Sequence, residues 1–131
     1  MQDTLNIPTI LIAVDGFDFA LSLSVAFEDE GFRTVHASDG NETIAAACVH
    51  IPDAIIVDVT MPKRSGVLVL EYLRTRTEIE CPIFLISNSE GQRLRKYAEV
   101  LGAAGYFCTP VTISQLLQSV VASLGESTVH E

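Results

Sequence analysis

Two patterns of apolar residues take turns along the chain: short apolar runs, and segments in which apolar residues recur at helical spacing. Five short apolar runs recur, several of them continuous and rich in β-branched residues, as expected of strands buried on both faces. They cover residues 9–14, 32–37, 54–57, 82–86 and 105–108. The run at 32–37 is the weakest, because Arg33, Thr34 and His36 interrupt it. The pattern therefore predicts five strands.

Each apolar run is followed by a segment in which apolar residues recur at helical spacing. Asp18 is the predicted cap of the first helix, and Gly31 is its predicted end. The other helices are predicted at about 40–50, 67–74, 90–101 and 113–124, and residues 125–131 are interpreted as a frayed tail. Alternating strands and helices are typical of right-handed βαβ units on a parallel sheet. With 131 residues, the chain is predicted to be a single α/β domain, 1–131, with a core at about 9–124.

Composition narrows the class of protein. Apolar residues make up 48% of the chain, which excludes a disordered polar segment, and no apolar run is long enough to span a bilayer. The net charge of -9 argues against nucleic-acid binding. The N-terminus lacks the basic segment of a secretory signal, so the cytoplasm is the expected location. The three scattered cysteines, Cys48, Cys81 and Cys108, are interpreted as packing residues rather than as a disulfide or metal framework.

Polar residues cluster where the predicted strands end. In parallel sheets of this kind, ligands bind outside the carboxyl ends of the strands. Those ends carry Asp15, Asp58, Ser87 and the pair Thr109-Pro110. Neighbouring carboxylates repel each other, and Mg²⁺ relieves that repulsion when it is held by one or two of them together with water. The alternative is that each aspartate only caps a following helix.

Three motifs resemble a known family. Residues 55–66 read IIVDVTMPKRSG, residues 81–87 read CPIFLIS, and residues 101–106 read LGAAGY and are followed by Pro110. In this order the motifs resemble the receiver domain of two-component response regulators, over about residues 9–124. The resemblance implies a doubly wound, flavodoxin-like sheet of order 2-1-3-4-5, with two helices on one face and three on the other. It also implies a signalling module, a phosphoprotein in a phosphorelay, rather than an enzyme.

The resemblance assigns roles to particular residues. Asp58 would accept a phosphoryl group from a phosphohistidine, forming an aspartyl phosphate. Mg²⁺ would be bound weakly by the carboxylates of Asp15 and Asp58 and the backbone carbonyl of Thr60. Ser87 and Tyr106 would be the switch residues, which change the face formed by the fourth helix, fifth strand and fifth helix. The implied partners are a histidine kinase or phosphotransfer protein, a downstream protein and a second copy in a homodimer, with neither nucleic acid nor a membrane as a direct partner.

Two positions depart from the family pattern. The family has two adjacent acids after the first strand, where this chain has Val14-Asp15, and a lysine before the last proline, where it has Thr109. Lys63 or Arg64 is a candidate replacement for that lysine. These departures leave a second hypothesis open, a pseudo-receiver that binds a protein partner without phosphorylation.

Other functions fit the sequence less well. A phosphatase of the haloacid dehalogenase type needs a second aspartate two residues after the first, where this chain has Thr60. A nucleotide-binding domain needs a glycine pattern that the residues after the first strand lack. Three cations of the fourth helix form either a partner-binding patch or a solvated face: Arg93, Arg95 and Lys96.

Overall fold

The sheet has the predicted topology. The computed structural model of the protein describes residues 7–88 and 92–128. Five parallel strands pair in the order β2-β1-β3-β4-β5. They are β1 (Thr9–Ala13), β2 (Arg33–Ala37), β3 (Ala54–Asp58), β4 (Ile83–Ser87) and β5 (Gly105–Cys108). The strands with the longest apolar runs lie inside the sheet, and the weakest run forms the edge strand β2, because only inner strands are covered on both faces.

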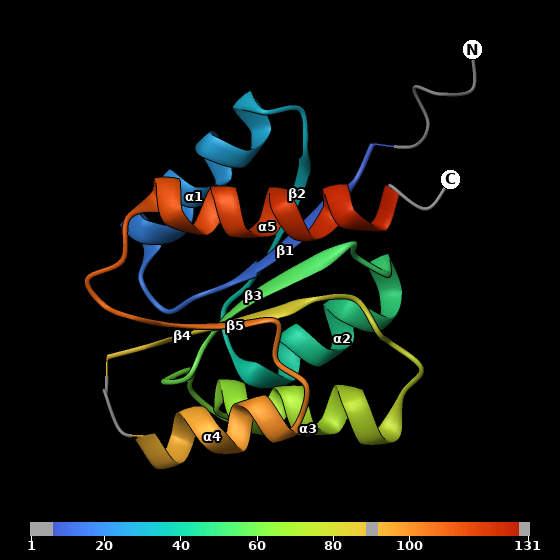
Figure 1. Cartoon of the computed structure of the whole chain (residues 1–131), viewed down its shortest axis with the longest axis vertical. Coiled ribbons are helices and arrows are strands. Elements are labelled where there is room, and N and C mark those ends of the chain that lie inside the picture. Colours follow the sequence, from blue (N-terminus) through green and yellow to red (C-terminus); the bar gives the residue numbers. More distant parts are fainter. Residues whose placement is uncertain (1–6, 89–91, 129–131) are drawn as a thin grey trace.

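Two helices cover one face of the sheet and three cover the other, as expected (Figure 1). One layer holds α1 (Phe17–Asp29) and α5 (Ile113–Thr128). The other holds α2 (Gly40–His50), α3 (Gly66–Arg76) and α4 (Gln92–Val100). Because side chains alternate along a strand, each sheet face contributes to a separate apolar core. Leu11 and Ile55 belong to the core under α2, α3 and α4, and Ile10 and Ile56 to the core under α1 and α5.

Several local predictions need correction. Asp18 does not cap α1: the helix begins at Phe17, Gly16 occupies the capping position, and no side chain bonds to the helix start there. The predicted frayed tail is partly wrong, because α5 continues to Thr128. Cys48 is exposed on α2 and is not a packing residue. The predicted start of the fourth helix, at residue 90, lies outside the described residues.

The strand register positions the predicted site. Ala13 pairs with Val57, Asp58 with Ile86, and Ser87 with Cys108. The residues that follow β1 and β5, and the last residues of β3 and β4, therefore meet at the same edge of the sheet. The prediction that the polar residues at the strand ends lie together is consistent with this register.

Candidate functional site

The carboxylate of Asp58 lies at the centre of the strand ends. It is the last residue of β3, and its side chain is half-buried. Its Oδ1 accepts hydrogen bonds from the Thr60 backbone N–H at 2.9 Å and from the Thr60 hydroxyl at 2.8 Å. Its Oδ2 accepts a longer hydrogen bond, 3.5 Å, from the backbone N–H of Asp15. One oxygen is thus fixed within its own loop, and the other faces the loop after β1.

The segment from Asp58 to Arg64 packs closely against the first residues of two helices, and neither of these positions has room for a side chain. Gly66, the first residue of α3, lies against the backbone of Asp58, and a Cβ at Gly66 would lie 2.6 Å from the Asp58 carbonyl oxygen. Gly40, the first residue of α2, likewise packs on the backbone of Arg64. The Gly40 N–H donates to the carbonyl of Pro62 at 3.0 Å. Close backbone approach of this kind fixes the loop relative to both helices.

The donor set at the strand ends suits a hard divalent cation. The exposed Asp15 adjoins Asp58 through its backbone N–H, and Thr60, whose carbonyl is the predicted third ligand, lies in the same loop as Asp58. Two carboxylates and a carbonyl, completed by water, match the ligands that Mg²⁺ takes in proteins. Val14 is only 5% exposed and belongs to the core under α1, so it contributes no ligand. Within the described residues, no three acidic, histidine or cysteine side chains cluster as a metal site.

The two predicted switch residues lie on neighbouring strands. Ser87 is buried at the end of β4, and its carbonyl accepts a hydrogen bond from the Thr109 N–H at 2.8 Å. Tyr106 on β5 is 8% exposed, with its ring turned into the core under α4. Its buried hydroxyl makes no hydrogen bond with the described residues. The observed state therefore has an inward Tyr106.

Arg95 contacts one of these two residues, Tyr106, and the sequence did not reveal this contact. Its guanidinium lies 4.8 Å from the centroid of the Tyr106 ring and donates to the Tyr106 carbonyl at 3.3 Å. Arg95 is half-buried, whereas Arg93 and Lys96 are exposed. The three cations of α4 therefore do not form one uniform solvated face. No local sequence signal separates them, because the contact depends on how α4 packs over β5.

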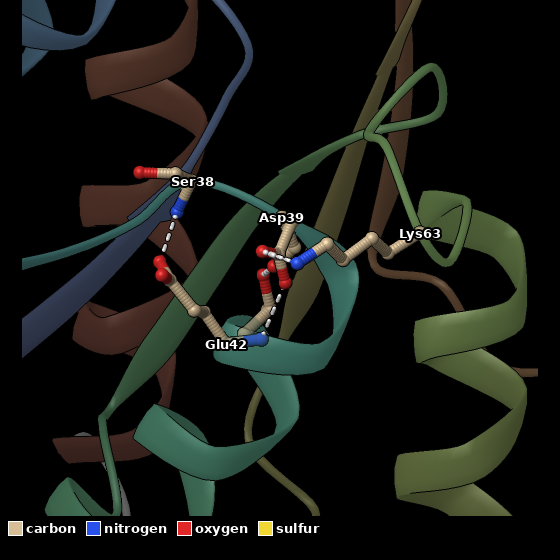
Figure 2. A network of polar contacts seen from close by, with 5 residues as sticks. Ser38, Asp39, Glu42 and Lys63 are labelled. Carbon is tan, nitrogen blue, oxygen red and sulfur yellow. Dashed lines mark hydrogen bonds and ion pairs between the residues drawn. The ribbon is translucent and has the colours of Figure 1, made fainter.

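Neither of the two candidate replacement cations contacts Asp58. Lys63 forms an ion pair with Asp39, 3.6 Å between Nζ and Oδ2, at the capped start of α2 (Figure 2). Arg64 instead lies over the ring of Tyr72, with its Cζ 5.3 Å from the centroid. Thr109 is exposed at the end of β5 and brings no charge.

The doubly wound parallel sheet, with acids at the carboxyl ends of its strands, is that of a flavodoxin-like α/β protein. Comparison with known proteins identifies the family. A protein-family model described as "Response regulator receiver domain" matches residues 10–121 of the chain. The chain belongs to the response regulator receiver domain family.

Individual relatives agree with this family. PdtaR of Mycobacterium tuberculosis strain H37Rv, a transcriptional regulatory protein, is 30% identical over 112 residues, which cover 85% of this chain and 54% of that protein. PrrA of the same organism is 30% identical over 124 residues, 95% of this chain and 53% of that protein. The receiver domain of Francisella response regulator 1452 superposes with a TM-score of 0.86 at 26% identity, covering 92% of this chain and 98% of that one. The chain thus spans about half the length of the two transcriptional regulators.

Family membership carries general properties. Receiver domains are signalling modules rather than enzymes. They bind Mg²⁺ at a phosphorylation site, and response regulators interact with histidine kinases and with downstream effectors. Among the described helices, none is both long and apolar enough to cross a membrane.

Proposed function

We propose that Asp58 is the phosphoacceptor of this domain and that 1–131 acts as a single receiver unit. The observation that supports this most directly is the hydrogen bonding of the Asp58 carboxylate. Thr60 fixes Oδ1 with two hydrogen bonds, whereas Oδ2 accepts only one long hydrogen bond, from the Asp15 N–H. An oxygen with fewer strong hydrogen bonds keeps more nucleophilic character. In the proposed transfer, Oδ2 forms a bond to phosphorus as the phosphorus–nitrogen bond of a phosphohistidine breaks, and the imidazole leaves with that electron pair.

Charge on the phosphoryl oxygens must be compensated during transfer. Asp15 and Asp58 would hold Mg²⁺ with the carbonyl of Thr60, and the bound ion would supply part of this compensation. The chain's own donors are the hydroxyls of Ser87 and Thr109 and nearby backbone N–H groups. No described cation contacts Asp58, so compensation by protein groups is weaker than in a receiver with a lysine at the Thr109 position.

The proposed output is a change at the face formed by α4, β5 and α5. The hydroxyl of Ser87 would turn toward the phosphoryl group, and Tyr106 would move into the space it leaves. Arg95 contacts the Tyr106 ring and backbone, so the movement would be transmitted to α4. A downstream protein, or a second copy in a homodimer, would bind this face.

The three free cysteines support the cytoplasm as the location, because thiols stay reduced there.

Phosphorylation is tested with acetyl phosphate as donor and intact-mass spectrometry as the readout. We expect one phosphoryl group on the wild-type chain with Mg²⁺, and none on Asp58→Asn. In a calorimetric Mg²⁺ titration, Asp15→Asn should bind more weakly than wild type; unchanged affinity would show that Asp15 is not a ligand. A wild-type chain that refuses phosphate while a receiver with the full acid pair accepts it would refute the proposal and favour the pseudo-receiver.

The missing charge is tested with Thr109→Lys. A new ammonium at this exposed position should raise the phosphorylated fraction, because a hydrogen bond to a charged group contributes about 1.5–3 kcal/mol. Thr109→Met, which adds similar length without charge, is the matched control. NMR signals of Ser87 and Tyr106 report whether the phosphorylated state switches more completely. Equal phosphorylation of both variants would mean that the lysine position has no electrostatic role here.

A further inference from the structure

A groove on the outer surface of α3 has a composition unlike the rest of this acidic chain. It has a volume of about 600 Å³, and its lining includes Lys63, Arg64, Glu71, Tyr72 and Arg76. The chain as a whole carries a net charge of -9. The groove gathers three cations and one acid. None of the proposed phosphorylation or switch residues lines it.

Two guanidinium groups lie against the same aromatic ring in this groove. The Cζ of Arg64 is 5.3 Å from the centroid of Tyr72, and that of Arg76 is 6.0 Å away. The negative face of the ring attracts each cation and offsets part of their mutual repulsion. In the described part of the chain, neither guanidinium forms a hydrogen bond or an ion pair with the protein. Their N–H donors are therefore available to a ligand.

Arg64 is anchored by its backbone. Its N–H donates to the carbonyl of Pro62 at 2.8 Å, and its carbonyl packs directly on Gly40 at the start of α2. The side chain is half-buried, unlike the freely solvated arginine expected in an exposed loop. A fixed backbone and an aromatic support reduce the conformational entropy lost when the guanidinium binds a ligand.

The ligand chemistry follows from these donors. The planar guanidinium matches the geometry of phosphate and carboxylate oxygens, and two of them lining one groove favour a dianion. The net negative charge of the domain repels a long polyanion such as nucleic acid, whereas a small anion needs only local compensation. The groove volume lies within the range of small-molecule sites, about 300–1,000 Å³. We infer that this groove binds a small organic phosphate through Arg64 and Arg76, independently of phosphorylation at Asp58.

The inference is tested on the full chain by NMR titration at low ionic strength, with adenosine 5′-monophosphate and inorganic pyrophosphate as the phosphate probes. Citrate is the carboxylate probe. We expect both phosphates to shift the arginine Nε–H signals of Arg64 and Arg76 and the amide of Tyr72. Citrate should bind at least about tenfold more weakly, because each of its carboxylates carries a single charge whereas a phosphate monoester carries nearly two on one group. Equal binding of citrate would overturn the assignment to phosphate, and the absence of shifts up to about 10 mM phosphate would overturn the site.

Variants distinguish specific binding of phosphate in the groove from a general attraction of anions to the cations of the surface. Arg64→Gln and Arg76→Gln should each weaken binding about tenfold, which corresponds to about 1.4 kcal/mol. Arg64→Lys should also weaken it, because the charge is kept but the forked geometry is lost. Glu71→Gln should strengthen it. The matched control is Arg93→Gln, which removes an exposed charge from α4 and should leave binding unchanged.

Two outcomes would contradict the groove as the site. One is equal weakening by Arg93→Gln and Arg64→Gln, which would indicate a general charge effect. The other is unaltered binding by the double variant at Arg64 and Arg76. Asp58→Asn serves a separate purpose: it should abolish phosphorylation without changing the affinity of the groove, so the two proposals fail independently.

Discussion

The buried hydroxyl of Tyr106 provides a direct test of the inward conformation of its ring. Tyr106 is 8% exposed, and its Oη has no hydrogen-bond partner among the described residues. A buried polar group without a partner costs about 1–3 kcal/mol relative to water. The change Tyr106→Phe removes only that hydroxyl and keeps the ring beside Arg95, 4.8 Å from its guanidinium carbon. We therefore expect the free energy of unfolding to increase by about 1 kcal/mol.

Urea denaturation followed by far-UV circular dichroism measures this effect without relying on the altered residue as a probe. With a urea m-value of about 2 kcal/mol per molar, the midpoint should rise by about 0.5 M at an unchanged m-value. The melting temperature should rise by about 3–5 °C. Tyr97→Phe is the matched control, because Tyr97 is 44% exposed on α4 and its hydroxyl reaches water. It should leave the midpoint unchanged.

A lower midpoint for Tyr106→Phe would refute the reasoning, because it would show that the hydroxyl is hydrogen-bonded in solution. The expected increase has a further consequence for the proposed switch. Stabilising the inward ring lowers the population of any outward state by the same free energy, about fivefold for 1 kcal/mol. Phosphorylated Tyr106→Phe should therefore show a smaller response of the α4 NMR signals than the phosphorylated wild type.

Three further predictions concern backbone geometry and burial. Gly66→Ala should lower the free energy of unfolding by about 1–3 kcal/mol in urea denaturation, because its Cβ would lie 2.6 Å from a backbone oxygen; wild-type stability would mean that the loop can relax. Ile51 ends α2 with a φ of 46° and is 65% exposed, so Ile51→Gly should keep or raise the urea midpoint. Val49→Gly, inside the same helix, should lower it by about 1 kcal/mol, and effects of equal sign would contradict the strain at Ile51. Burial raises the pKa of Cys81 to about 11, from 9.0 for a free thiol, so the folded state retains this proton where the unfolded state has lost it. Stability should accordingly fall between about pH 9 and pH 11 in pH-dependent denaturation, and less so in Cys81→Ala.

The sequence alone was sufficient for the fold and for the grouping of polar residues at one edge of the sheet. Strands that are covered on both faces must be apolar throughout, so the runs containing Ile12, Ile56 and Leu85 predict their own burial. Alternation with helices then leaves a parallel sheet as the natural architecture. Asp15 and Asp58 follow two such runs directly. Their common edge needed no information beyond the direction of the strands.

Helix ends were predicted less well, because they depend on backbone angles that side-chain type constrains only weakly. Asp18 is a good capping residue by composition, yet the chain turns at Gly16, where φ is 128° and most side chains would be strained. α5 continues through Gly125, although glycine usually weakens a helix. Leu117 and Leu124 pack against the core under α1 and α5, and this tertiary contact offsets the local preference.

The partners of the charged residues were decided only by the tertiary structure. Lys63 and Arg64 lie in the loop after Asp58, but a φ of 69° at Lys63 accompanies a turn that brings its ammonium to Asp39. Arg95 looks like its exposed neighbours in sequence, yet it contacts Tyr106 on another element. Periodicity records which face of an element is buried, whereas a pair of side chains from different elements depends on how the layers close around them. The packing of helices on the sheet depends on the whole chain, so these side-chain pairs cannot be predicted from any local sequence pattern.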